Sequence, residues 1–250
     1  MKILRYEKDG QNSYGVLEGD TIKQLTEEPY EKIAYTGQTV LLEQVRLLAP
    51  SVPKNIVAVG LNYKQHSVEF GMDLVPEPMV FAKALSSLLD PFGKIIKPAV
   101  CERLDYEAEL GVVIKKRCEK INRADAKDYI LGYTCLNDVT ARDIQKKESQ
   151  WLRAKGFYTF CPVGPWVETD IEPGDLHLQA ILNGRIVQDD RTSSMLFDVP
   201  YLLEYISSFM RLMPGDVIAT GTPGGIGGMQ SGDEIKIKIE GIGELINTID

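Results

Sequence analysis

Apolar and polar residues alternate along several short stretches of this chain, which is the pattern of a strand with one buried face. Between residues 234 and 240 three isoleucines alternate with charged residues. Residues 176–182 alternate in the same way and are followed by Asn183-Gly184, a pair that favours a tight hairpin turn. The same criteria predict further strands at residues 3–7, 14–18, 21–25, 54–59, 79–83, 130–137 and 217–220.

Helical spacing of apolar residues is less frequent along the chain. Asp198 is followed by Val199-Pro200, and apolar residues then recur at helical spacing as far as Ile206, which predicts a helix that opens at Asp198. Shorter helices are predicted at residues 62–71, 124–129 and 140–147. Strands dominate and are spaced like hairpins, so the predicted fold class is a β-rich α+β fold rather than a doubly wound sheet.

Two prolines divide the chain near residue 50. Pro50 and Pro53 disfavour both a helix and a central strand, so residues 50–53 are predicted to be a linker. We expect residues 1–50 to form a small N-terminal β domain without evident chemistry. Residues 51–250 are expected to form one larger domain, which the length and the 44% hydrophobic content allow.

Composition excludes several classes of partner. The net charge of −8 and the absence of a Lys/Arg cluster argue against nucleic acid or an anionic membrane, and leave a small substrate. The first residues are too polar for a signal peptide, and no stretch approaches the roughly 18 apolar residues of a membrane span, so we expect a cytoplasmic protein. The four cysteines form no C-x-x-C pair, which indicates neither a zinc site nor a disulfide framework.

An acidic stretch, Asp105-Tyr106-Glu107-Ala108-Glu109, runs directly into an apolar one at residues 110–114. In a strand the three acids share one face, and Glu107 and Glu109 lie roughly 7 Å apart, close enough to converge on one ion. The alternative is an acidic edge strand that resists aggregation. The apolar run that follows is typical of a buried strand, and buried carboxylates need a cation or a hydrogen-bond donor.

The chain has two histidines, and they differ in context. His177 lies on an alternating strand and is predicted to be a surface residue. His66 lies on a predicted helix three residues before Glu69, so both face the same side. A carboxylate orients an imidazole and raises its basicity, which makes His66 the candidate general base. A hydrogen-bonded helix histidine without a catalytic role is the alternative.

Several other polar residues have two interpretations each. Asp138 ends a predicted strand, where it could join Glu107 and Glu109 around a hard cation such as Mg²⁺ or Mn²⁺, or could cap the next helix. Gln145 and Lys155 look locally like a surface helix residue and a solvated lysine. The glycine-rich segment 221–228 leads into a strand rather than a helix, which argues against a nucleotide fingerprint. It is better explained as a loop at a pocket, where Thr222 could bind a substrate carboxylate.

Six motifs follow one another in order along the chain: Val59-Gly60-Leu61-Asn62-Tyr63 leading to His66, Asp105-Tyr106-Glu107-Ala108-Glu109-Leu110, Asn137-Asp138-Val139-Thr140-Ala141-Arg142-Asp143, Lys155-Gly156-Phe157, Thr192-Ser193-Ser194-Met195 and Thr220-Gly221-Thr222-Pro223. Over roughly residues 50 to 250 they resemble the fumarylacetoacetate hydrolase family. The resemblance is closest to acylpyruvases, to oxaloacetate decarboxylase-like members and to the bacterial 2-hydroxyhepta-2,4-diene-1,7-dioate isomerase group. It implies a mixed β-sandwich roll with a small N-terminal domain, usually as a homodimer.

The resemblance also implies roles for individual residues. The metal ligands would be Glu107, Glu109 and Asp138, for Mg²⁺ or Mn²⁺. The catalytic residues would be the water-activating pair His66 and Glu69, with Gln145 and Lys155 at the developing negative charge. The substrate contacts would be Arg142, Thr222 and Lys83. Two departures are visible: Leu61 stands where some members have an arginine, and Ala84 replaces a common proline.

The activity that follows is enolate stabilisation on a 2-oxoacid by a divalent metal. Hydrolysis of a carbon–carbon bond in an acylpyruvate-type substrate is the expected reaction. The same site could instead decarboxylate or tautomerise oxaloacetate, or act as a 2-hydroxyhepta-2,4-diene-1,7-dioate isomerase/decarboxylase. A hypothesis of a different class is a non-catalytic protein that binds a dicarboxylate.

Overall fold

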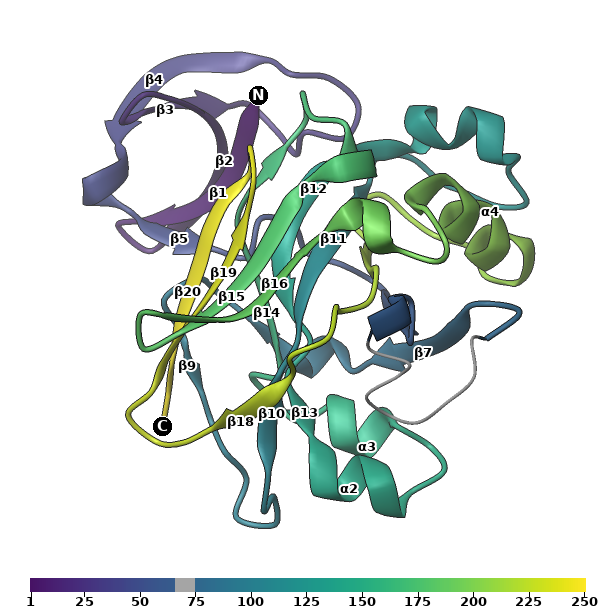
Figure 1. The fold of residues 1–250 in the computed structure, drawn as a ribbon. Coiled ribbons are helices and arrows are strands. Elements are labelled where there is room, and N and C mark those ends of the chain that lie inside the picture. The colour runs from purple at the N-terminus through teal and green to yellow at the C-terminus, as the bar shows by residue number, and fades with distance from the viewer. Residues whose placement is uncertain (66–74) are drawn as a thin grey trace.

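The computed structural model describes residues 1–65 and 75–250, and Figure 1 shows its ribbon. The chain is rich in strands and belongs to the α+β class, which confirms the predicted fold class. Within the described residues no helix is long and apolar enough to cross a membrane. All four cysteines are buried and free.

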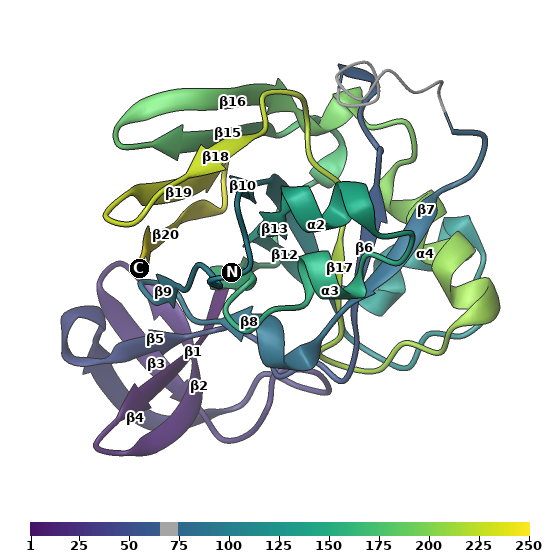
Figure 2. The same ribbon diagram turned by 90° about the horizontal axis from the view of Figure 1, so that it is seen from below.

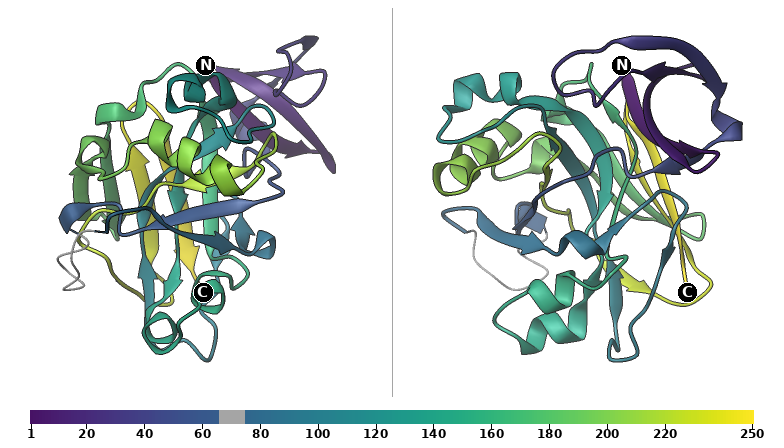
Figure 3. Two further views of the ribbon diagram at one scale, coloured as in Figure 1. Left: turned by 90° about the vertical axis from the view of Figure 1, so that its right-hand side faces the viewer. Right: turned by 180° about the vertical axis from the view of Figure 1, so that it is seen from behind.

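The N-terminal residues form a small curved set of antiparallel strands at one end of the molecule (Figures 1 and 3). Turns at Asp9-Gly10 and Gly19-Asp20 connect the first three strands, which lie close to the strands predicted at residues 3–7, 14–18 and 21–25. β1 also pairs with β14 of the larger part of the chain, so the N-terminal strands continue a sheet of the larger part. The strands are β1 (Lys2–Lys8), β2 (Gln11–Glu18), β3 (Thr21–Leu25), β4 (Tyr35–Leu41) and β5 (Arg46–Leu48), with the 3-10 turn η1 (Leu42–Gln44).

The central sheet runs in the order β4-β3-β2-β1-β14-β12-β11-β17-β6-β7. In addition, β5 pairs with β1 and β8 pairs with β14. β11 lies between β12 and β17 and is buried along its whole length. Its apolar residues face cores on both sides, as expected for a strand buried on both faces. The further strands of this sheet are β6 (Ile56–Gly60), β7 (Met79–Lys83), β8 (Leu88–Leu89), β11 (Ala108–Ile114), β12 (Ile130–Asn137), β14 (Cys161–Glu168) and β17 (Val217–Ala219).

A second sheet runs in the order β16-β15-β19-β20-β9 (Figure 2). It packs against β11, β12 and β14. The alternating isoleucines of β19 are buried in the core between the sheets, as their spacing predicts. β15 and β16 form the predicted hairpin, with Asn183 and Gly184 at positive φ in the turn. The strands are β9 (Lys94–Ile95), β15 (His177–Leu182), β16 (Arg185–Arg191), β19 (Glu234–Ile239) and β20 (Gly243–Ile249).

Short elements complete the described fold. A small sheet joins β13 (Thr140–Ala141), β10 (Leu104–Tyr106) and β18 (Gly227–Met229). Asp198 accepts a hydrogen bond from the backbone N–H of Tyr201 and caps α4, which confirms the predicted helix start. The helices are α2 (Arg142–Lys147), α3 (Leu152–Lys155) and α4 (Val199–Phe209), with 3-10 turns η2 (Leu85–Ser87), η3 (Arg123–Tyr129), η4 (Pro173–Asp175) and η5 (Thr192–Ser194).

Candidate metal centre and substrate cavity

Glu107 separates β10 from β11, and the alternation of side chains continues across this break. Tyr106, Ala108 and Leu110 lie in the main hydrophobic core. The carboxylates of Glu107 and Glu109 therefore lie on the opposite face, where both are buried. The predicted alternation of this stretch is confirmed.

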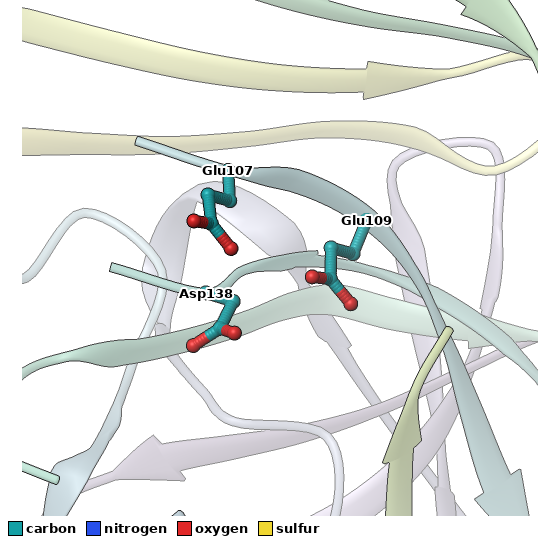
Figure 4. Close-up of side chains that lie close together, drawn as sticks. All are labelled: Glu107, Glu109 and Asp138. Atoms are coloured by element: carbon teal, nitrogen blue, oxygen red, sulfur yellow. The ribbon is translucent and has the colours of Figure 1, made fainter. Parts of the chain in front are cut away.

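Asp138 joins these two acids because it follows β12, the neighbour of β11. The antiparallel register places Ala108 opposite Asn137, and the backbone N–H of Asp138 donates to the carbonyl oxygen of Glu107 at 2.9 Å. One carboxylate oxygen from each of Glu107, Glu109 and Asp138 lies within 4.8 Å of the other two. Figure 4 shows the three carboxylates gathered on one side of the strands.

The alternative interpretation of Asp138, as a helix cap, is wrong. Helix α2 begins at Arg142, its capping residue is Ala141, and no side chain caps it. Residues 140–141 form a strand, so the helix begins at residue 142, two residues after the predicted start. The carboxylate of Asp138 instead contacts two buried lysines.

Lys155 lies at the end of α3 and is buried, not solvated. Its Nζ atom donates to Glu107 Oε2 and to Asp138 Oδ2, each at 2.6 Å. Lys83, also buried, contacts Asp138 Oδ1 and donates to the carbonyl oxygen of Lys155 at 2.6 Å. Burial lowers the pKa of Lys155, but Asp138 and Glu107 outweigh it, so the pKa lies above its ordinary value and the group is charged.

Arg142 holds the other side of Glu107. Its Nη2 atom contacts Glu107 Oε1, and its Nε atom donates to Asp105 Oδ2 at 2.8 Å. Its Nη1 atom donates to the side-chain oxygen of Gln145, which fixes the amide of that residue. Asp105 shares the face of Glu107 as predicted, but its partners are arginines and it is not part of the acidic cluster.

One carboxylate of the site lacks a cationic partner among the described residues. Lys83, Arg142 and Lys155 pair with Asp105, Glu107 and Asp138, and Arg103 also pairs with Asp105. Glu109 makes no ion pair within the described part of the chain, although the backbone N–H of Gly221 donates to its Oε2 atom at 2.7 Å. Burial raises the pKa of Glu109 well above its usual range, and Asp138 and Glu107 raise it further.

The donor set therefore fits a hard divalent cation. All three groups are carboxylates, the ligand type that Mg²⁺ and Mn²⁺ prefer. A cation placed among them would neutralise the excess negative charge that the buried Glu109 carries. The positions of the three carboxylates and their negative charge therefore both favour a divalent cation.

A cavity of about 150 Å³ opens beside the three acids. About 10–15 Å³ of such volume is enough for one water molecule, so this cavity has room for a small organic acid. The acids, Arg142 and Lys155 form its polar side, together with Gln145 and Thr222. Apolar side chains also line the cavity, namely Val59, Leu61, Phe81 and Trp151, together with Lys146. The Phe81 ring lies beside Lys155, whose Nζ atom is 5.2 Å from the ring centroid.

The glycine-rich loop contributes Thr222 to the lining of this cavity and leads into β18 and β19, not into a helix. Gly221 has a φ of +97°, and a Cβ atom there would lie 2.7 Å from Asn62 Cβ, so a larger residue would strain this turn. The interpretation of the segment as a loop at a pocket is confirmed for Thr222, which lines the cavity.

The remaining predicted residues are less simply placed. Lys83 is not among the residues that line the cavity, and its Nζ atom donates to Asp138 and to the carbonyl oxygens of Val139 and Lys155. His66 and Glu69 lie outside the described residues, as does most of the predicted helix at 62–71. His177 is a partly exposed residue of β15 and contacts Asp189, in agreement with its predicted surface position.

Two aromatic residues of the cavity wall were not singled out from the sequence. The rings of Phe81 and Trp151 meet edge to face with centroids 5.3 Å apart. A Cβ atom on Gly60 would lie 2.9 Å from Trp151 Cζ3, so the ring packs directly on the backbone at the end of β6. Gly60 is the feature of the sequence that could have indicated this packing, since a glycine in a strand often marks a place where another group approaches the backbone closely.

Comparison with known proteins identifies the family. The model described as fumarylacetoacetate (FAA) hydrolase C-terminal matches residues 55–250, and one described as Rv2993c-like, N-terminal matches residues 1–50. The chain therefore belongs to the fumarylacetoacetate hydrolase family. Family membership and the acidic cluster together support a metal-dependent enzyme of this type.

Three similar proteins illustrate this relationship. Protein Rv2993c of Mycobacterium tuberculosis is 44% identical over 232 residues, which cover 92% of this chain and 88% of that protein. The structure of 2-hydroxyhepta-2,4-diene-1,7-dioate isomerase from Mycobacterium marinum is 40% identical, with a TM-score of 0.93 over 100% of this chain and 98% of that chain. The structure of maleylpyruvate hydrolase from Sphingobium, solved in complex with manganese(II) and pyruvate, is 29% identical. Its TM-score is 0.82, over 100% of this chain and 98% of that chain.

Proposed function

We infer that this protein is a Mg²⁺- or Mn²⁺-dependent enzyme that hydrolyses a carbon–carbon bond of an acylpyruvate-type 2-oxoacid. The observation that carries the proposal is the convergence of Glu107, Glu109 and Asp138 at one side of a small cavity. The manganese and pyruvate bound to the similar maleylpyruvate hydrolase support it.

The three carboxylates would hold the cation. When bound, it would supply Lewis acidity toward the 2-oxo and carboxylate oxygens of the substrate. Thr222 would bind the substrate carboxylate, and Arg142 would position Gln145 and Glu107 beside it. Lys83, which contacts Asp138, would orient this ligand from behind.

We assign the activation of the attacking water molecule to His66 and Glu69. This pair would take a proton from water as its oxygen attacks the distal carbonyl carbon. The bond between that carbon and the pyruvoyl methylene then breaks, and its electron pair stays on the pyruvoyl group as an enolate. Protonation of the enolate gives pyruvate, and the acyl group leaves as a carboxylate. Lys155 and Gln145 would stabilise the negative charge during the attack.

A second candidate has support in a comparison. The similar chain from Mycobacterium marinum is described as 2-hydroxyhepta-2,4-diene-1,7-dioate isomerase, and isomerisation or decarboxylation of a 2-oxoacid needs the same enolate without water attack. Oxaloacetate is the simplest substrate of this kind. The alternative from another class is a dicarboxylate-binding protein that keeps the cavity but catalyses no reaction.

One set of assays separates these functions. Pyruvate release from acetylpyruvate, CO₂ release from oxaloacetate and enol–keto conversion of oxaloacetate are each measured with Mg²⁺, with Mn²⁺ and with EDTA. We expect metal-dependent pyruvate release to be fastest. Faster decarboxylation or tautomerisation would replace the proposed reaction by the second candidate, and binding without turnover would establish the third.

The organisation of the chain is part of the proposal. The two family models meet between residues 50 and 55, which supports a division into domains 1–50 and 51–250. We also propose a homodimer, in keeping with the family resemblance. Light scattering of the purified protein tests it, and a monomeric mass would refute it.

A further inference from the structure

Gln188 is a buried residue of β16 that links the acidic strand to the loop that carries Thr222. It is 1% exposed and lies on the opposite sheet from the metal cluster. Its Oε1 atom accepts a hydrogen bond from the backbone N–H of Ala108 at 2.9 Å. Its Nε2 atom donates to Thr222 Oγ1 and to the carbonyl oxygen of Pro223, both at 2.9 Å.

The orientation of this amide is set by its backbone partners. The N–H of Ala108 can only donate, so the oxygen of Gln188 must face it. The carbonyl of Pro223 can only accept, so the nitrogen must face the loop. Exchange of the two amide atoms would therefore lose both hydrogen bonds and bury two unsatisfied groups.

The orientation of Gln188 determines what the Thr222 hydroxyl can do. A hydroxyl has one hydrogen to donate, and here its oxygen already accepts from Gln188. No hydrogen bond donated by this hydroxyl is found within the described part of the chain, and Thr222 lines the cavity. Its hydrogen is thus available to an acceptor in the cavity, and the bond from Gln188 polarises the hydroxyl as a donor.

We propose that Gln188 is a positioning residue that makes Thr222 a hydrogen-bond donor to the carboxylate of a bound 2-oxoacid. This inference rests on the proposed function, because it takes the anion in the cavity to be that substrate. Gln188 itself does not line the cavity and acts through Thr222.

The connection to Ala108 adds a positional role. Ala108 lies between Glu107 and Glu109, so Gln188 sets the loop at a fixed place relative to these carboxylates. The bond from Gly221 N to Glu109 Oε2 ties the same loop at a second point. A Cβ atom on Gly225 would meet the carbonyl oxygen of Val187 at 2.5 Å, so the loop also lies tightly on β16. The donor and the cluster are thereby held together.

A double-mutant cycle tests the proposal. The Kd of pyruvate for the Mn²⁺-loaded protein is measured by calorimetry in wild type, Gln188→Met, Thr222→Val and the double variant. Each single substitution is expected to weaken pyruvate binding by about tenfold, the usual scale for one hydrogen bond to a charged group. The double variant is expected to bind no more weakly than Thr222→Val, because Gln188 acts through the hydroxyl. Additive losses would overturn the proposal.

Two controls isolate the role of the hydroxyl. Thr222→Ser keeps the hydroxyl and is expected to bind pyruvate nearly as well as wild type; a loss equal to that of Thr222→Val would overturn the proposal. Gln179→Met, a matched change on the neighbouring strand β15, is expected to leave the Kd unchanged. Binding of Mn²⁺ itself is expected to be the same in all variants, since none of them removes a carboxylate.

A measurement that leaves Gln188 intact covers the case in which its variants fail to fold. The side-chain amide signals of Gln188 are followed by NMR in the Mg²⁺-loaded protein. They are expected to shift when pyruvate is added to wild type, and not in Thr222→Val; the same response in both proteins would overturn the proposal. Absence of any pyruvate binding to metal-loaded wild type would instead refute the proposed function, and the inference with it.

Discussion

The Nζ atom of Lys155 lies 2.6 Å from the Oδ2 atom of Asp138, with both side chains buried. The same nitrogen lies 2.6 Å from Glu107 Oε2, so one ammonium bridges two of the three carboxylates of the cluster. Lys155 thereby neutralises charge at the place where a divalent cation would do the same. We therefore expect Lys155 to stabilise the metal-free protein and to weaken the binding of a metal ion.

The first prediction concerns Lys155→Met. Removal of one partner of a buried ion pair typically costs about 3–5 kcal/mol, because the other charge stays buried without compensation. We expect the variant to be less stable than wild type by this amount in EDTA, and to gain more stability from Mn²⁺. Chemical denaturation with EDTA and with Mn²⁺ measures both quantities.

A surface lysine provides the control for this experiment. Lys127 pairs with Glu172, and its side chain is 82% exposed. Lys127→Met should change the free energy of unfolding by less than about 0.5 kcal/mol under either condition. If Lys155→Met proved equally harmless in EDTA, the bridge between the carboxylates would contribute nothing to the fold.

The second prediction concerns pH and Glu109. Burial raises the pKa of Glu109 in the folded, metal-free protein. A group with a raised folded pKa contributes stability that is fully present below its unfolded pKa, about 4.3 for Glu. That contribution is lost as the pH rises through the folded pKa. Metal-free wild type should thus lose stability above about pH 4.3 through this group, and Glu109→Gln should not.

The matching experiment is thermal unfolding in EDTA from acid to neutral pH. The Tm of Glu109→Gln minus that of wild type should increase as the pH rises. Mn²⁺ should then raise the Tm of wild type at neutral pH but leave that of Glu109→Gln nearly unchanged, because a ligand is missing. Parallel pH curves for the two metal-free proteins would contradict the prediction.

Much of the fold could be predicted from local patterns. The hairpin at Asn183-Gly184, the strand with alternating isoleucines and the helix after Asp198 each depend on residues close in sequence, which set the turn, the buried face or the cap. Sheet order could not be predicted this way. The pairing of β1 with β14 joins residues more than 160 positions apart, and nothing local in Lys2 or Ile3 specifies that partner.

The same limit applies to the candidate site. An aspartate before a helix can be a cap or a ligand, and the register of β11 with β12 decides for Asp138. Lys155 looks solvated in its local sequence because its burial depends on Glu107 and Asp138, which lie far from it along the chain. Gln188 lies on an edge strand with mostly polar neighbours, so no periodic pattern marks it as buried.

The third prediction concerns His66, which was assigned from the sequence and the family resemblance. His66→Ala should lower hydrolysis of acetylpyruvate by about 10²-fold or more, the usual scale for a positioned base. It should spare decarboxylation of oxaloacetate, because that reaction needs no activated water. The kcat values of both reactions are compared in wild type and variant. Equal losses would argue against a water-activating role for His66.

The fourth prediction concerns the apolar wall of the cavity. Trp151 lines the cavity and packs edge to face against Phe81. We expect the acyl group of a substrate whose 2-oxoacid end binds at the carboxylates to lie against this apolar ring. Trp151→Leu should enlarge the cavity and raise kcat/KM for a longer acylpyruvate relative to acetylpyruvate by about tenfold, since one methylene in an apolar pocket is worth 10- to 200-fold.

Gly60→Ala should act in the opposite direction. The added methyl group would lie 2.9 Å from Trp151 Cζ3, which is too close, so the ring must move. If it moves into the cavity, kcat/KM falls more for the longer substrate than for acetylpyruvate. Tyr158→Leu, a change at an exposed aromatic residue, serves as the control and should leave the ratio unchanged. An unaltered ratio in Trp151→Leu would show that the acyl group lies elsewhere, because a substrate packed on this ring must respond to its removal.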